Sequence, residues 1–114
     1  MARAKKWNTK SKIVPALRRI WLHSPLRREA IKRAKDGDYY RCELCSSLQE
    51  KLYVDHITPA VSTEGWSGYD DFVMKLFCPP TELQSICESC HTVKTEEENR
   101  LRKENRHKRK NNEK

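Results

Sequence analysis

Two Cys-x-x-Cys pairs constrain this chain more than any other feature. Cys42 and Cys45 form the first pair, Cys87 and Cys90 form the second, and 41 residues separate the pairs. Each two-residue spacer allows a tight turn that brings both sulfur atoms to one ion, and four thiolates satisfy a tetrahedral Zn²⁺. The spacing therefore predicts a structural zinc site. Redox dithiols or unpaired cysteines are the alternatives.

A bound metal would add stability that the small hydrophobic content of the chain does not provide. The chain has 114 residues, of which 36% are hydrophobic, and its mean hydropathy is −0.97. A domain of this size has a small core, so we expect a metal or disulfides to stabilise it. We see no signal peptide and no apolar run that could span a membrane. This favours an intracellular, reducing setting, where paired cysteines bind metal more often. Cys78, the fifth cysteine, is predicted to be a small core residue.

The net charge of +8 is unevenly distributed. Residues 1–35 carry twelve Lys or Arg and one acid, residues 36–99 carry four and thirteen, and residues 100–114 carry eight and two. Two basic ends therefore flank an acidic middle. Basic segments suit a polyanion such as nucleic acid, with solubilising tails as the alternative. An anionic membrane is disfavoured, because the ends lack an apolar face with aromatic anchors.

The hydrophobic spacing predicts a small α+β domain with helices at its N-terminus. Residues 1–12 are expected to be a loose arm, and Ser24-Pro25 resembles a helix N-cap followed by proline at the first helical position. A hairpin of residues 39–41 and 52–55 is expected, followed by a loop over 57–68. The predicted helices cover residues 13–23, 25–35, 69–77 and 87–106, and the last predicted strand covers 83–86.

Asp55, His56 and His91 form the only constellation of acid and imidazole that the sequence offers. If zinc holds Cys90 beside the first cysteine pair, His91 lies near the strand that carries Asp55. A carboxylate oxygen and an imidazole nitrogen suit Mg²⁺, Mn²⁺ or a similar ion, and His56 is then free to act as a base. The alternative is that both histidines only support the zinc fold by hydrogen bonding. Spacing alone does not separate these interpretations.

A combined motif decides between them. The chain resembles the HNH endonucleases, and most of all the small four-cysteine HNH proteins encoded by bacteriophages. The likeness covers roughly residues 40–98, including Gly65-Trp66 and the helix expected over 69–77. It is carried by Asp55-His56-Ile57-x-Pro59 and by Leu83-Gln84-x-Ile86-Cys87-x-x-Cys90-His91-x-x-Lys94-Thr95.

The resemblance implies a ββα-metal (His-Me finger) fold with a treble-clef-like zinc held by four cysteines. It also implies DNA hydrolysis, with His56 as general base and with Asp55 and His91 on a divalent ion. One position departs from the family. Glu82 stands where an Asn usually precedes the Leu-Gln, so it is a candidate third metal ligand, a substituted brace or a sign of weakened activity.

The expected organisation has three parts: basic arm and helices over 1–38, nuclease domain over 39–106, and basic tail over 107–114. DNA is the expected partner, with little sequence specificity. Lys94, Arg100, Arg27 and Arg28 are the predicted phosphate contacts, although Lys94 could instead pair with Glu97 or Glu98. The alternative function is a zinc-stabilised DNA-binding or packaging-accessory module, which would bring phage packaging proteins as partners. For a phage-encoded protein the expected location is the host cytoplasm. The oligomeric state is not predicted.

Overall fold

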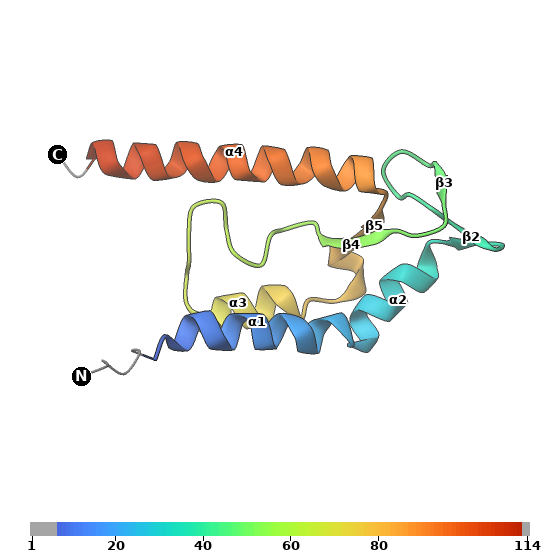
Figure 1. The fold of residues 1–114 in the computed structure, drawn as a ribbon, viewed down its shortest axis with the longest axis horizontal. Helices are drawn as coiled ribbons and strands as arrows, with labels where there is room; N and C mark the ends of the chain where they lie inside the picture. Colours follow the sequence, from blue (N-terminus) through green and yellow to red (C-terminus); the bar gives the residue numbers. More distant parts are fainter. Residues whose placement is uncertain (1–6, 113–114) are drawn as a thin grey trace, which may run out of the picture.

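The computed structural model describes residues 7–112 and has the expected α+β class. Four α-helices and five short strands make up most of this part of the chain (Figure 1). The helices are α1 Thr9–Leu22, α2 Pro25–Arg33, α3 Tyr69–Leu76, the 3-10 helix η1 Pro80–Glu82, and α4 Glu88–Asn112. The strands are β1 Lys35–Asp36, β2 Tyr39–Arg41, β3 Leu48–Gln49, β4 Tyr53–His56 and β5 Leu83–Ile86.

The first helix begins earlier than the periodicity predicted. Asn8 caps α1 by accepting a hydrogen bond from the backbone N–H of Ser11 at 3.0 Å, so residues 9–12 are helical and not a loose arm. Pro15 consequently lies inside the helix and not in its first turn. The second helix begins as predicted, with Ser24 accepting from the Arg27 N–H at 3.4 Å. Residues 1–6 of the expected arm lie outside the described residues.

The strands pair differently from the expected hairpin. Strand β2 lies between β1 and β3 in a three-stranded antiparallel sheet, while β4 pairs only with β5. The reason is the first Cys-x-x-Cys turn, in which the Ser46 N–H bonds to the Cys42 carbonyl at 2.9 Å. Ser46 takes a left-handed conformation with φ of 64°, and the chain then returns along β2 before β4 begins.

The core consists of two neighbouring clusters of buried side chains. The larger one joins Trp21 of α1 and Ala30 of α2 to Phe72, Leu76 and other residues. The N-terminal helices therefore pack into the same core as the strands. The smaller cluster surrounds Cys42 and Cys87. Cys78 is buried in the larger cluster, as predicted.

The last helix is longer than expected and extends away from the strands (Figure 1). Residues 107–112, predicted as a frayed tail, continue α4. The loop 57–68 lies between α4 and the helices α1 and α3, and it was correctly predicted to lack helix and strand. Arg102 and Asn105 of α4 donate to the carbonyls of Val61 and Thr63, at 3.1 and 3.0 Å. Among residues 7–112, no helix is long and apolar enough to cross a membrane.

Candidate metal centre and candidate active site

The four predicted zinc ligands converge. Their sulfur atoms all lie within 4.8 Å of one another, and this group is called the cysteine cluster below. Cys42 and Cys90 Sγ are 3.8 Å apart, and Cys45 and Cys87 Sγ are 3.7 Å apart. A tetrahedral zinc with bonds of about 2.3 Å requires sulfur separations of roughly 3.8 Å. The cluster therefore fits a structural ion such as zinc.

Neighbouring groups shift the pKa of Cys45 and the pKa of Cys90 in opposite directions. Hydrogen bonds from Ser47 lower the pKa of Cys45 to about 6, whereas the hydrogen bond with Cys87 raises the pKa of Cys90 to about 12. Each further thiolate beside the first is unfavourable unless a positive charge is near. The backbone N–H groups of Cys45 and Cys87 also point at Cys42 Sγ, at 3.5 and 3.3 Å, and favour its thiolate.

A polar link that the sequence analysis missed ties the cysteine cluster to β5 and α2. The Arg33 guanidinium donates to both carboxylate oxygens of Glu43 and to the Pro80 and Leu83 carbonyls, at 2.9 to 3.1 Å. Glu43 Oε1 in turn accepts from the Ser85 N–H at 2.6 Å. Burial raises the pKa of Glu43, but the hydrogen bond from Arg33 and the other contacts outweigh it and lower that pKa overall. Arg and Glu occur throughout the sequence, so the sequence alone does not show that Arg33 and Glu43 pair. Only the structure does.

His56 lies at the end of β4 and faces α1 and α3. Its ring centroid is 4.5 Å from that of Trp21, and its Nε2 is 2.8 Å from the Leu76 carbonyl oxygen. A carbonyl can only accept, so Nε2 carries the proton and Nδ1 keeps a free lone pair. Burial lowers the pKa of His56, although the bond to Leu76 and the charge of Asp55 oppose the shift. The imidazole is therefore neutral and held in one tautomer at neutral pH.

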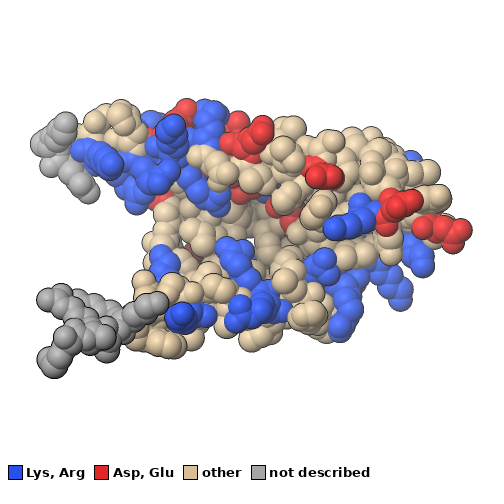
Figure 2. All heavy atoms as spheres, in the orientation of Figure 1, with Lys and Arg blue, Asp and Glu red and all other residues tan. Residues whose placement is uncertain are grey.

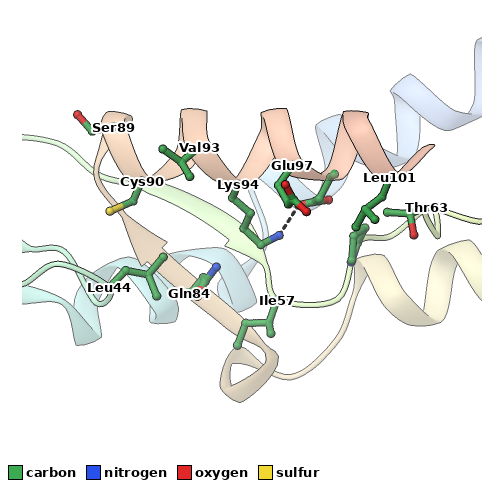
Figure 3. A pocket seen from close by; sticks show the side chains of 12 residues that line it. Leu44, Ile57, Thr63, Gln84, Ser89, Cys90, Val93, Lys94, Glu97 and Leu101 are labelled. Carbon is green, nitrogen blue, oxygen red and sulfur yellow. Dashed lines mark hydrogen bonds and ion pairs between the residues drawn. The ribbon is translucent and has the colours of Figure 1, made fainter. Parts of the chain in front are cut away.

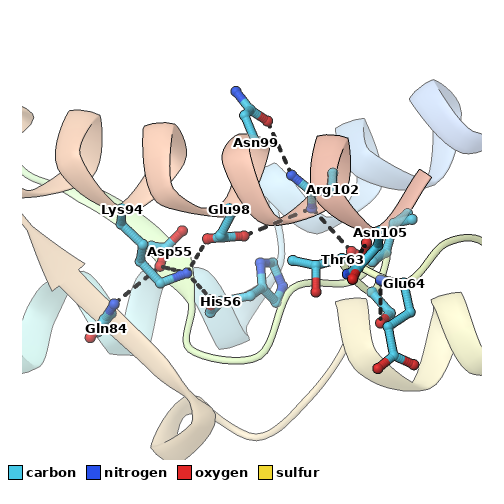
Figure 4. A network of polar contacts seen from close by, with 12 residues as sticks. Asp55, His56, Thr63, Glu64, Gln84, Lys94, Glu98, Asn99, Arg102 and Asn105 are labelled. Carbon is cyan, nitrogen blue, oxygen red and sulfur yellow. Dashed lines mark hydrogen bonds and ion pairs between the residues drawn. The ribbon is translucent and has the colours of Figure 1, made fainter. Parts of the chain in front are cut away.

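Asp55 lies on the opposite face of β4, against α4 (Figure 4). Its Oδ2 is 2.8 Å from Lys94 Nζ and accepts from Gln84 Nε2 at 3.1 Å. The strand was expected to end at Asp55, but β4 continues through His56. The strand includes both residues, so alternation places their side chains on different faces.

The Lys94 ammonium is held by three groups. It pairs with Asp55, forms an ion pair with Glu98, and donates to the His56 carbonyl at 3.0 Å. Asp55, Lys94, Glu98 and this carbonyl are called the lysine cluster below. The pairing with Glu98 is the helical i+4 contact that the sequence offered as the alternative to a phosphate contact.

The three residues predicted to hold a divalent ion are not brought together. The His91 ring stacks on Tyr53 with centroids 5.2 Å apart, while Glu82 lines a separate pocket with Thr58 and Cys78. Within residues 7–112, the cysteine cluster is the only group of three or more His, Cys, Asp or Glu side chains whose ligand atoms meet. The structure thus does not support a Mg²⁺ or Mn²⁺ site made of Asp55, Glu82 and His91.

A groove of about 780 Å³ gives solvent access to the lysine cluster (Figure 3). It runs between the first Cys-x-x-Cys turn, β5 and α4, and Lys94 extends into it beside Gln84. Most of its walls are apolar, and several of these side chains are exposed, namely Leu44, Ile57 and Val93. The groove therefore opens the lysine cluster to solvent between largely apolar walls.

The other predicted DNA contacts are only partly free. Arg100 pairs with Glu97 and Glu104 on the surface of α4, and Arg28 donates to the His23 carbonyl at 3.1 Å. Arg27 is half-buried on α2. Figure 2 shows Lys and Arg gathered on both α4 and the N-terminal helices, so positive charge lies on both sides of the loop 57–68.

Comparisons with models of protein families, with curated proteins and with solved structures found no match. The chain is therefore assigned to no family here, and its likeness to HNH endonucleases rests on the motifs alone.

Proposed function

We propose that the chain is a zinc-stabilised DNA endonuclease of the HNH type. The state of His56 carries this proposal: a neutral imidazole with Nε2 bound to the Leu76 carbonyl offers Nδ1 as a proton acceptor. The antiparallel pair β4–β5, followed directly by α4, supports assignment to a ββα-metal fold. The cysteine cluster supports a treble-clef-like zinc at the junction of these elements.

The proposed reaction is hydrolysis of a phosphodiester. Water transfers a proton to His56 Nδ1 while its oxygen adds to phosphorus, and the bond from phosphorus to one sugar oxygen breaks. The leaving sugar oxygen takes a proton from solvent water, and His56 returns its proton to solvent. A base of lowered pKa is suited to this step, because it is unprotonated at neutral pH and so ready to accept.

Positive charge near His56 supports a phosphate-bearing substrate. Burial and the charge of Arg102 on α4 lower the pKa of Arg18 on α1, and the charge of Arg18 also acts on His56. Two cations that repel each other favour a phosphate nearby, and Arg102 already has one carboxylate partner, Glu98 Oε2 at 3.8 Å. The basic residues of both regions extend this field and suit a nucleic-acid backbone without base recognition.

Plasmid relaxation tests the proposal. Zinc-loaded wild type is compared with His56→Ala in Mg²⁺ and in Mn²⁺, with His23→Ala as the matched control, since His23 is exposed at the end of α1. We expect the wild type and His23→Ala to relax the plasmid and His56→Ala to lose roughly 10²-fold or more of the rate. Equal rates for His56→Ala and wild type would remove His56 as the base.

The second candidate is a DNA-binding or packaging-accessory module without activity. The separation of Asp55, Glu82 and His91 favours it, because no divalent ion is then held beside the phosphate. This candidate predicts salt-dependent DNA binding but no relaxation in either metal. A third candidate, a protein–protein adaptor, predicts no salt-dependent affinity for DNA.

A further inference from the structure

Three oxygen atoms surround the Lys94 ammonium. Asp55 Oδ2 lies at 2.8 Å, the His56 carbonyl oxygen at 3.0 Å, and Glu98 Oε1 completes the set (Figure 4). An ammonium has three N–H donors, so every donor of Lys94 is used. The oxygens come from the end of β4 and from one turn further along α4.

The arrangement is largely shielded from solvent. The side chains of Lys94, Asp55 and Glu98 are 21%, 16% and 17% exposed. Burial alone would lower the pKa of Lys94, but its bonds to Asp55 and Glu98 outweigh burial and raise that pKa. Lys94 is therefore a permanent cation at neutral pH.

The same oxygens are ligands of the kind a divalent cation takes. Two carboxylates and one backbone carbonyl are typical hard ligands for Mg²⁺ or Mn²⁺. The set predicted from sequence (Asp55, Glu82, His91) is not assembled, whereas these oxygens already surround one positive charge.

We infer that Lys94 is the resident counter-ion of Asp55 and Glu98 and competes with a divalent ion for them. An ion entering from the groove must displace the ammonium before it can use the Asp55 carboxylate. The inference gains its biological meaning from the proposed nuclease function. Its test needs neither DNA nor cleavage, so either idea can fail without the other.

The test measures Mn²⁺ binding by calorimetry on the full, zinc-loaded chain in the absence of DNA. Lys94→Met keeps the side-chain length and removes the charge, while Lys94→Arg keeps the charge and serves as the matched control. We expect Lys94→Met to bind Mn²⁺ about tenfold or more tightly than wild type and Lys94→Arg to behave like wild type. The double variant Lys94→Met/Glu98→Gln should lose most of the gain.

Two results would overturn the inference. One is equal Mn²⁺ affinity in Lys94→Met and wild type, and the other is a gain that persists undiminished in the double variant. If Lys94→Met does not fold without added ions, Mn²⁺ must restore its folding, because an ion that binds only the folded state stabilises that state. An unfolded variant that does not respond to Mn²⁺ also contradicts the inference.

Discussion

The cysteine cluster and the lysine cluster lie on the same small scaffold, yet they differ in how charge is balanced. The cysteine cluster gathers four acidic groups without a cation among its own members. The lysine cluster gathers two carboxylates and includes its own ammonium. The comparison teaches that ligand-type residues in sequence do not by themselves mark a metal site. What matters is whether the chain also supplies the neutralising charge.

The largest expected effect is loss of the ion from the cysteine cluster. Cys87→Ser removes a buried ligand, and we expect cooperative folding to be lost. Structural zinc in finger peptides contributes on the order of 10–16 kcal/mol, whereas whole domains are stable by only about 5–15 kcal/mol. Circular dichroism and zinc content measure the effect. Cys78→Ser is the control, because that buried thiol is outside the cluster, and it should retain zinc. A Cys87→Ser protein that melts like wild type would contradict the zinc site.

Arg33→Ala tests how much the polar link between the cysteine cluster and β5 contributes to the free energy of unfolding. Arg33 joins Glu43, next to the first zinc ligand, to the backbone at β5, which also carries Gln84 of the Asp55 contact. Loss of charged hydrogen bonds should cost roughly 1–3 kcal/mol. Denaturant unfolding of the zinc-loaded chain measures this, with Arg41→Ala, an exposed ion-pair arginine, as the matched control. If Arg33→Ala is no less stable than Arg41→Ala, the link adds nothing to stability beyond an exposed ion pair.

A double-mutant cycle with Asp55→Asn and Lys94→Met should give a coupling free energy of about 1–2 kcal/mol, because this ion pair is largely shielded from water. Unfolding of the four proteins without added divalent ions supplies the values. A coupling near zero would mean that the lysine cluster is no more than a surface contact.

The pH dependence of stability should report His56. Burial lowers its pKa in the folded state, while the unfolded value is about 6.5. As the pH falls below about 6.5 the unfolded state takes up the proton first, so the wild type loses stability; well above that pH both states are neutral. His56→Gln should lose this part of the slope. The difference between the two zinc-loaded proteins from pH ~7.5 to ~5.5 isolates it, and parallel curves would exclude the shift.

The smallest effect is expected for the surface pair of Arg100 with Glu104. These side chains are about half exposed, at 53% and 49%. The cycle of Arg100→Gln with Glu104→Gln should give a coupling close to zero and smaller than that of the Asp55–Lys94 pair. Comparison with the Asp55–Lys94 cycle then measures what shielding adds. If this coupling is as large as that of the Asp55–Lys94 pair, shielding from water does not explain the strength of the Asp55–Lys94 pair.

The parts of the fold that local chemistry determines could be predicted. The Ser24 cap, the helix over Tyr69–Leu76 and the strand Leu83–Ile86 follow from capping and periodicity. The start of α1 was missed because Asn8 caps it ahead of the apolar residues. The extension of α4 was missed because its last turns are polar on all sides, so no hydrophobic period marks them.

In the candidate site, the spacing of residues along the chain was sufficient to predict the cysteine cluster but not the contacts of Asp55. The sequence cannot reveal that β4 continues through His56, and this one residue decides which face the imidazole takes. It also cannot reveal that Gln84 lies opposite Asp55, since strand register depends on tertiary packing. The Glu98 contact, by contrast, was visible as an i+4 spacing from Lys94.

One consequence concerns the two ends of α4. Cys90 lies in its first turn, and Arg109 lies near the other end against Gly65, where an added Cβ would sit 3.1 Å from the guanidinium. The stretch of helix between these two residues spans about 28 Å. The helix is thus held in its first turn by the cysteine cluster, and near its other end the Arg109 side chain packs against the backbone at Gly65. An ion bound by the four thiolates would therefore fix the first turn of the same helix that carries Arg102, Arg106 and Arg109 at its far end.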